Sequence, residues 1–279
     1  MSNIPFDLTL ISFLLFCVVG IVIFGAIFPK VNEVLLPRSS RAKLFPRKVF
    51  LDFHELIAVV VEKYQGTWSY EILLAVMILI PAAIFWYGVI KYSINLAYFD
   101  DLITFTFIAG MEEAQTFAEK LHYLLGRHNE HLVLFYRLSA WILFSINGEI
   151  NFRVAAILGS LSMIILLILF YMMIPKSRYR LLCIVPLVPF ILSLNTWKLV
   201  INPINPLSNY YVLCFAGAAL WCLNKRGNIF FCAGLFLAFF AAFSQASGIL
   251  LFASGQLFLI YKKNHIKGAI WFLFGLICV

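Results

Sequence analysis

The feature that most constrains this chain is a series of apolar runs long enough to cross a lipid bilayer, joined by short basic loops. The 279 residues are 63% hydrophobic and only 12% charged, whereas about a quarter of the residues in a soluble domain are charged. A helix of about 20 apolar residues spans the hydrocarbon core. The sequence therefore predicts an all-α, polytopic membrane protein. The net charge of +8 is not a nucleic-acid signal, because it must first be divided among the loops.

The apolar runs predict about seven to eight transmembrane helices. They cover residues 8–28, 71–96, 154–174, 181–194 and 210–223, two short spans within 229–261, and a last run that stops at Val279. Two spans are expected within 229–261 because one helix of that length would overshoot the core. Residues 1–70 form an N-terminal part, with one span and a basic loop that holds an amphipathic helix at residues 49–63. Residues 71–279 form the main module, which we expect to be truncated at its C-terminus.

The distribution of Lys and Arg predicts the orientation of the chain. Alternate loops, at residues 29–70, 175–180, 225–226 and 262–267, hold seven, three, two and three of these cations, which is fifteen of the twenty-one. Loops rich in Lys and Arg stay on the cytoplasmic side. The N-terminus and the stretch 98–153 are therefore expected on the outer face, and a bacterial inner membrane is the expected location.

The external stretch 98–153 is where the chain concentrates its chemistry. It holds seven of the thirteen acidic residues and three of the five histidines, and no Asp or Glu follows Glu149. An apolar stripe from Phe107 to Leu125, with Gly126 as its C-cap, predicts one amphipathic helix. Residues 132–146 predict a second. Both are expected to lie on the outer leaflet, because a span at 132–146 would reverse every later loop and break the charge pattern.

Asp100 and Asp101 are the predicted catalytic residues. They lie where the second span leaves the membrane, and partial desolvation there raises the pKa of a carboxyl group and makes it a better base. Side chains one residue apart do not face the same way, so one is expected to act and the other to orient or solvate. Asp100 is the first choice and Asp101 the second. The alternative is that both are interfacial charges at a helix exit.

A second polar cluster predicts a binding site for a lipid phosphate. The candidate binding residues are His128, Asn129, Glu130, His131, Arg137, Arg153 and Lys198. Cationic side chains and helix-terminus amides suit a phosphate at a bilayer surface. The alternatives are a capped turn between two surface helices for the 128–131 group, and a snorkelling cation for Arg153. His128 and His131 are three residues apart, which is poor spacing for a metal, so no metal and no cofactor are expected.

Three motifs, in this order and spacing, resemble the GT-C membrane glycosyltransferases, which include protein O-mannosyltransferases and the aminoarabinose transferases of lipid A. They are Tyr98-Phe99-Asp100-Asp101 after a span, the phrase at residues 146–156 (INGEINFRVAA) that opens the next span, and residues 243–251 (FSQASGILL) in the short paired spans. Asn129-Glu130-His131 is similar to a signature of uncharacterised bacterial members. The resemblance covers roughly 71–261. The chain departs from it in its extra N-terminal span and in a second external loop, 195–209, that has asparagines but no acid.

The resemblance implies an inverting glycosyltransferase that moves a sugar from a polyprenyl-phosphate donor to an acceptor hydroxyl at the outer face. Asp100 or Asp101 would be the general base, and the phosphate would be held by some of the binding residues named above. The expected partners are the donor, membrane lipid, and an acceptor glycan, lipid or protein, with no nucleic acid. Two other classes stay open. One is a multi-span acyl- or phosphotransferase that uses His128 or His131 as its base, and the other is a non-enzymatic membrane subunit for envelope polysaccharide.

Overall fold

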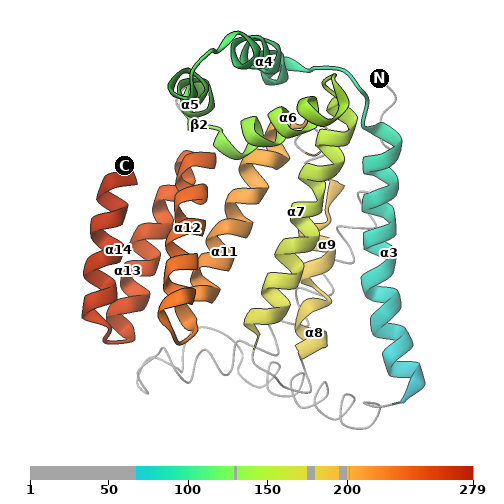
Figure 1. Ribbon diagram of the computed structural model, residues 1–279. Helices are drawn as coiled ribbons and strands as arrows, with labels where there is room; N and C mark the ends of the chain where they lie inside the picture. The colour runs from blue at the N-terminus through green and yellow to red at the C-terminus, as the bar shows by residue number, and fades with distance from the viewer. Residues whose placement is uncertain (1–66, 129–130, 175–179, 195–199, 201, 279) are drawn as a thin grey trace, which may run out of the picture. The chain divides into compact units, whose positions relative to one another are not determined.

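The computed structural model describes residues 67–128, 131–174, 180–194, 200 and 202–278 (Figure 1). These residues are mostly helical. The chain divides into two units, Met1–Trp86 with Ile174–Asn195, and Tyr87–Met173 with Thr196–Val279. The predicted span 8–28 and the amphipathic helix 49–63 lie outside the described residues.

Three described helices are long and apolar enough to cross a membrane. They are α3 (Trp68–Tyr92), α7 (Phe152–Met173) and the continuous pair η3 (Pro206–Tyr210) and α11 (Tyr211–Asn224). This supports the prediction of a membrane protein. The shorter apolar helices are Arg180–Ile191, Asn228–Ser244, Ala246–Tyr261 and His265–Cys278.

The first unit contains most of α3 and the short helices α8 (Arg180–Ile184) and α9 (Leu187–Ile191). Its small core is built on Leu74 and Val185, both buried. The run predicted as one span over 181–194 is divided at Pro186, which lacks the N–H that would continue the helix. The apolar helix Arg180–Ile191 therefore lies where the span was predicted, with a turn at Pro186, and the span itself stays a prediction.

The second unit is a row of helices. Alongside α7 and α11 run α12 (Asn228–Ser244), α13 (Leu250–Tyr261) and α14 (His265–Cys278), and η4 (Ala246–Ile249) joins α12 to α13 (Figure 1). The two helices predicted within 229–261 are confirmed. A side chain on Gly248 would collide with the Ala241 carbonyl, so only glycine lets η4 fold back against α12 at this point.

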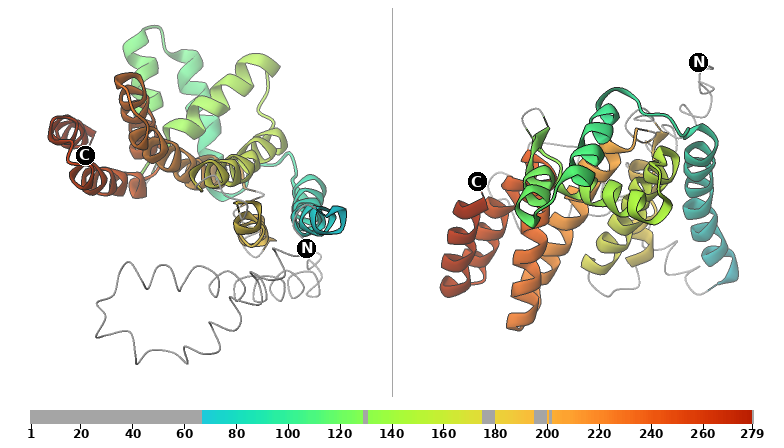
Figure 2. Two further views of the ribbon diagram at one scale, coloured as in Figure 1. Left: turned by 90° about the horizontal axis from the view of Figure 1, so that it is seen from below. Right: turned by 45° about the horizontal axis from the view of Figure 1, so that its top comes forward.

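A cap of short elements lies across one end of this row (Figures 1 and 2). It consists of η1 (Phe99–Leu102), α4 (Ile103–Glu113), α5 (Phe117–Leu125), the strands β1 (Arg127–His128) and β2 (His131–Leu132), and α6 (Leu134–Asn147). The helix predicted over 132–146 is confirmed as α6. It crosses the ends of α7 and α11 instead of running beside them.

The amphipathic helix predicted from Phe107 to Leu125 is wrong as a single helix. The chain breaks between α4 and α5, where the Thr116 hydroxyl accepts a hydrogen bond from the Glu119 N–H (3.2 Å) and the Glu119 carboxylate accepts one from the Thr116 N–H (3.1 Å). This capping box starts a new helix. α5 then folds back so closely that the ring of Tyr123 occupies the space where Gly110 lacks a side chain. Gly126 is the C-cap of α5, as predicted.

Candidate functional site

Asp101 is the centre of the polar structure in the cap. Its side chain is fully buried, and one carboxylate oxygen accepts a hydrogen bond from the backbone N–H of Ile204 at 3.0 Å. The other accepts from the backbone N–H of Tyr98 at 3.3 Å. The amide of Asn202, in the orientation that satisfies its hydrogen bonds, donates to both oxygens at 2.8 Å. Asp101 therefore holds the loop before η3 against η1.

Burial controls the protonation of Asp101. Removal from water disfavours the charged carboxylate and raises its pKa from an ordinary 3.8 to about 6, while the N–H groups of Ile204 and Tyr98 act in the opposite direction. The neighbouring charge of Asp100 raises it slightly further. The Asn202 amide also favours the charged form, because it donates to it. Asp101 is thus a fixed acceptor whose charge is sensitive to pH near neutrality.

Tyr136 and Thr104 are buried polar residues of the cap, and the charge of Asp101 acts on Tyr136. Neither was among the predicted site residues. Both side chains are buried, and their hydroxyl groups share a short hydrogen bond. Burial, and next the charge of Asp101, raise the pKa of Tyr136 above its ordinary value. A hydroxyl that stays protonated is a donor and not a base. Nothing in the sequence singles out this pair, which is 32 residues apart and meets only because α6 packs on α4.

Asp100 faces the opposite environment to Asp101. Its side chain is 55% exposed, and its Oδ1 lies 3.7 Å from Nε2 of His128. The preceding Phe99 has a positive φ of 49°, a conformation that costs a non-glycine residue about 1 kcal/mol or more. This strained residue starts the tight turn in which one carboxylate points into the protein and its neighbour points out.

His128 is positioned by the hairpin of β1 and β2. It pairs with His131 in the backbone register, and Arg127 pairs with Leu132. Its side chain is only 15% exposed, and its Nε2 is buried without a hydrogen-bond partner among the described residues. The N-cap of α6 is Val133, so neither histidine of the 128–131 group caps that helix. Asn129 and Glu130 lie outside the described residues.

Arg137 joins the end of α5 to α6. Its guanidinium donates to the carbonyl oxygens of Tyr123 (2.7 Å), Gly126 and Arg127 (3.4 Å), and it lies over the ring of Phe107 at 5.5 Å. A cation here satisfies carbonyls that the helix leaves without partners. Burial lowers its pKa. Arg137 therefore fixes the backbone that leads into His128.

Arg153 lies at the start of α7 and away from this group. It donates to the carbonyl of Ile90 at 3.0 Å and is otherwise exposed. Lys198 lies outside the described residues. Of the predicted site residues, the structure brings together Asp100, Asp101 and His128, with Arg137 behind the hairpin. In the described part of the chain, no group of three His, Cys, Asp or Glu side chains is placed to hold a metal ion.

Three comparisons with known proteins found no match to this chain. No model of a protein family matches the chain, and neither characterised proteins nor solved structures give a match.

Proposed function

We propose that the protein is a membrane glycosyltransferase that moves a sugar from a polyprenyl-phosphate donor to an acceptor hydroxyl, with inversion and with Asp100 as general base. The observation that carries this proposal is the division between two adjacent carboxylates. Asp101 is fully buried and held by three donors, whereas Asp100 is more than half exposed beside His128. A base that acts on a substrate must reach it, and Asp100 meets this condition.

His128 is the proposed contact for the donor phosphate. Its Nε2 makes no hydrogen bond to the described residues and lies 3.7 Å from Oδ1 of the exposed Asp100, and a protonated imidazole stabilises a phosphate leaving group. Asp101, Arg137 and Tyr136 are positioning residues in this proposal, because their contacts with the protein fix the turn, the hairpin and the packing of α6 on α4.

The membrane arrangement of the proposal follows the charge pattern of the sequence. It has seven to eight spans in a bacterial inner membrane, with the cap of η1 to α6 on the outer face. The stretch between α3 and α7, which contains the cap, holds every Asp and Glu after Glu71, whereas the turns between α11 and α12 and between α13 and α14 carry Lys and Arg but no acid. A donor anchored in the bilayer would reach a cap that lies across the helix ends (Figure 1).

One further function is favoured by a specific observation. The pair of exposed Asp100 and mostly buried His128 also suits an acyl- or phosphotransferase, in which Asp100 would orient His128 as the base. The two functions differ in which residue accepts the proton. The non-enzymatic alternative predicts that neither residue matters for turnover.

The deciding experiment measures release of polyprenyl phosphate by the full chain in lipid nanodiscs. The donors are short-chain prenyl phosphates that carry mannose, glucose or aminoarabinose, and an envelope extract supplies acceptors. Asp100→Asn should lower turnover by about 10²–10⁴-fold, as removal of a positioned base does. His128→Gln should mainly raise the KM for the donor.

Glu113→Gln is the matched control, because Glu113 is an exposed carboxylate on α4 of the same cap. It should keep wild-type turnover. Thermal unfolding of each variant shows that the fold is retained. Near wild-type turnover in Asp100→Asn would refute the proposed base. Loss of kcat in His128→Gln, with donor KM unchanged, would favour the histidine mechanism.

A further inference from the structure

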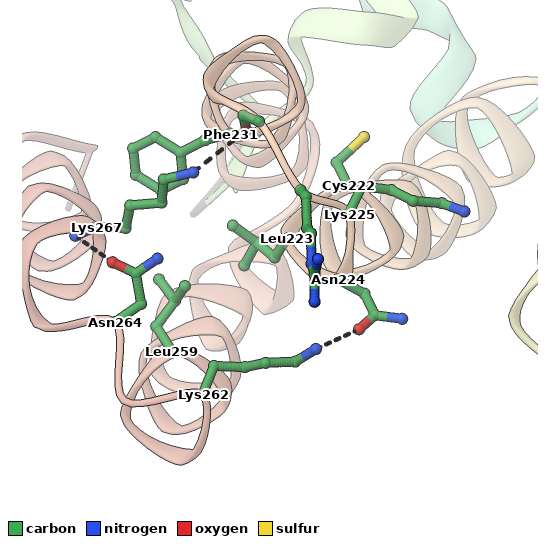
Figure 3. A pocket seen from close by; sticks show the side chains of 11 residues that line it. Cys222, Leu223, Asn224, Lys225, Phe231, Leu259, Lys262, Asn264 and Lys267 are labelled. Atoms are coloured by element: carbon green, nitrogen blue, oxygen red, sulfur yellow. Dashed lines mark hydrogen bonds between the residues drawn. The ribbon is translucent and has the colours of Figure 1, made fainter.

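The end of the second unit opposite the cap contains a basic pocket. It has a volume of about 330 Å³ and lies where the turns after α11 and α13 meet (Figure 3). Four cations line it, Lys225, Arg226, Lys262 and Lys267. None of the described lining residues is acidic, and the sequence has no carboxylate side chain after Glu149.

The lysines of the pocket are held in place by neutral groups. Lys262 Nζ donates to Asn224 Oδ1 at 2.8 Å, and Lys267 Nζ donates to the carbonyl of Gly227 at 3.2 Å (Figure 3). Lys225 lies over the ring of Trp221, with its Nζ 4.7 Å from the centroid. These contacts orient the ammonium groups without neutralising them, so the positive charge of the pocket is available to a ligand.

The backbone adds to this charge. α12 and α14, of 17 and 14 residues, begin at the pocket, which Gly227 and Asn264 line directly before their first residues. The N-terminal end of a helix carries partial positive charge and attracts anions. Two helix starts and four cations around one cavity therefore favour an anion with several acceptor oxygens.

The apolar part of the pocket indicates where the anion comes from. Leu223, Phe231 and Leu259 line it, and all three are buried. The pocket also adjoins the last residue of η3–α11, a helix long and apolar enough to cross a membrane. Basic pockets between membrane helices bind the head groups of anionic lipids.

We propose that this pocket binds a phosphate-bearing anion, and that its source is the head group of an anionic phospholipid. The cations bind the phosphate oxygens, and Leu223, Phe231 and Leu259 contact the start of the acyl chains. This site is separate from Asp100 and His128, and it does not depend on the function proposed for them.

The test measures lipid binding to the full chain purified in a neutral detergent. Micelles doped with phosphatidylglycerol, or with phosphatidylcholine as the neutral lipid, are titrated against the protein, and inorganic phosphate forms a separate arm. Arg226→Gln with Lys225→Gln removes two pocket cations whose side chains make no hydrogen bond across the turns in the described part of the chain. It should weaken phosphatidylglycerol binding by about ten- to thirtyfold, since each basic residue contributes roughly a factor of five.

The matched control is Lys263→Gln with Lys120→Gln, which removes the same total charge from one exposed and one half-buried position outside the pocket. It should change binding by less than about twofold. A second pocket variant, Lys262→Gln with Lys267→Gln, should show the same loss as the first, and thermal unfolding checks that each variant is folded.

The outcomes separate the sources of the anion. Weaker phosphatidylglycerol binding in both pocket variants but not in the control supports the lipid site. Binding of inorganic phosphate that depends on the pocket, without selective lipid binding, retains the anion site but refutes the lipid as its source. Equal weakening in the control, or no pocket-dependent binding of either probe, overturns the proposal.

Discussion

The two ends of the second unit differ in the sign of their charged groups and in how those groups are held. At the cap, a buried carboxylate, Asp101, is held by donors from Tyr98, Asn202 and Ile204. At the other end, Lys262 and Lys267 are held by neutral acceptors and are not neutralised. The 19 residues of η3 and α11 connect the two ends, a separation of about 28 Å for a helix of that length.

This difference separates a charge that holds the fold together from charges that stay accessible. A buried carboxylate is costly unless it is hydrogen-bonded, so Asp101 serves the architecture of the cap, whereas Asp100 stays exposed. Cations that are oriented by neutral groups keep their full positive charge, and this charge attracts an anion from outside the protein. The exposed residue at one end and the unneutralised cluster at the other are therefore the places to look for ligands.

The largest expected effect concerns the sides of the membrane on which the two ends lie. In a chain whose native cysteines are replaced by alanine, Gln115→Cys should react with an impermeant thiol reagent applied to intact cells, and His265→Cys should not. Both native residues are exposed, so accessibility of the fold does not limit either reaction. The physical reason is the retention of Lys- and Arg-rich loops in the cytoplasm.

The control for this measurement is reaction of both cysteines after the cells are lysed. Labelling of position 265 and not 115 in intact cells would invert the orientation and move Asp100 to the cytoplasmic side. Labelling of both would mean that the two ends do not lie on opposite sides.

The next effect concerns the stability of the cap. Asp101→Ala removes the acceptor for the backbone N–H groups of Tyr98 and Ile204 and for the Asn202 amide. Buried donors left without partners cost about 1–3 kcal/mol each, so we expect a loss of roughly 3 kcal/mol in the free energy of unfolding. Thermal unfolding in detergent measures it.

Asp100→Ala is the matched control for this loss, because it removes a carboxylate from the adjacent, exposed position. Its effect should stay within about 0.5 kcal/mol. Equal destabilisation by the two substitutions would contradict the division of roles between the two acids.

The smallest effect is a dependence of stability on pH. The folded pKa of Asp101, about 6, lies above its ordinary value of 3.8, so between these values the folded state binds more protons than the unfolded state. Stability should therefore fall as pH rises from about 4 to about 6 and then level off. The Asn202 amide favours the charged form of Asp101 and so brings its folded pKa closer to the ordinary value. We therefore expect the free energy of unfolding to change by about 1–2 kcal/mol across this pH range.

The measurement compares the thermal unfolding of wild type and Asp101→Asn at pH 4.5 and pH 7. The asparagine does not titrate, so the difference between the two proteins isolates Asp101 from the other acids. A difference that is constant with pH would show no shift in its pKa, and one of opposite sign would show that the donors outweigh burial.

Much of the helix pattern was predictable from local sequence. Runs of apolar residues gave α3, α7 and α11, and the polar interruption around Gln245 gave the division between α12 and α13. The break between α4 and α5 was missed although its signal, Thr116 followed by Glu119, is present in the sequence. The turn at Pro186 within the run 181–194 could also have been predicted from the sequence, because proline does not continue a helix.

The candidate site was predictable only in part. Adjacent acids at a span exit and a polar cluster with two histidines pointed to Asp100, Asp101 and His128, because charged residues are rare in such a chain and stand out. The partners Asn202 and Ile204 lie about a hundred residues further along the chain. No local pattern connects them to Asp101, since their contact depends on where η1 meets the loop before η3.

The sequence by itself determined that this chain is helical, rich in membrane-grade apolar segments, and divided into a carboxylate-bearing part and a later part whose only charged side chains are cationic. These are properties of composition and order, which hold whatever the packing. Only the tertiary structure decided which of two neighbouring aspartates is buried, that Arg137 donates to carbonyls, and that three cations from two separate turns share one pocket with Lys267 of α14. The reason is that burial and proximity arise from contacts between segments distant in the chain, and all three features depend on such contacts.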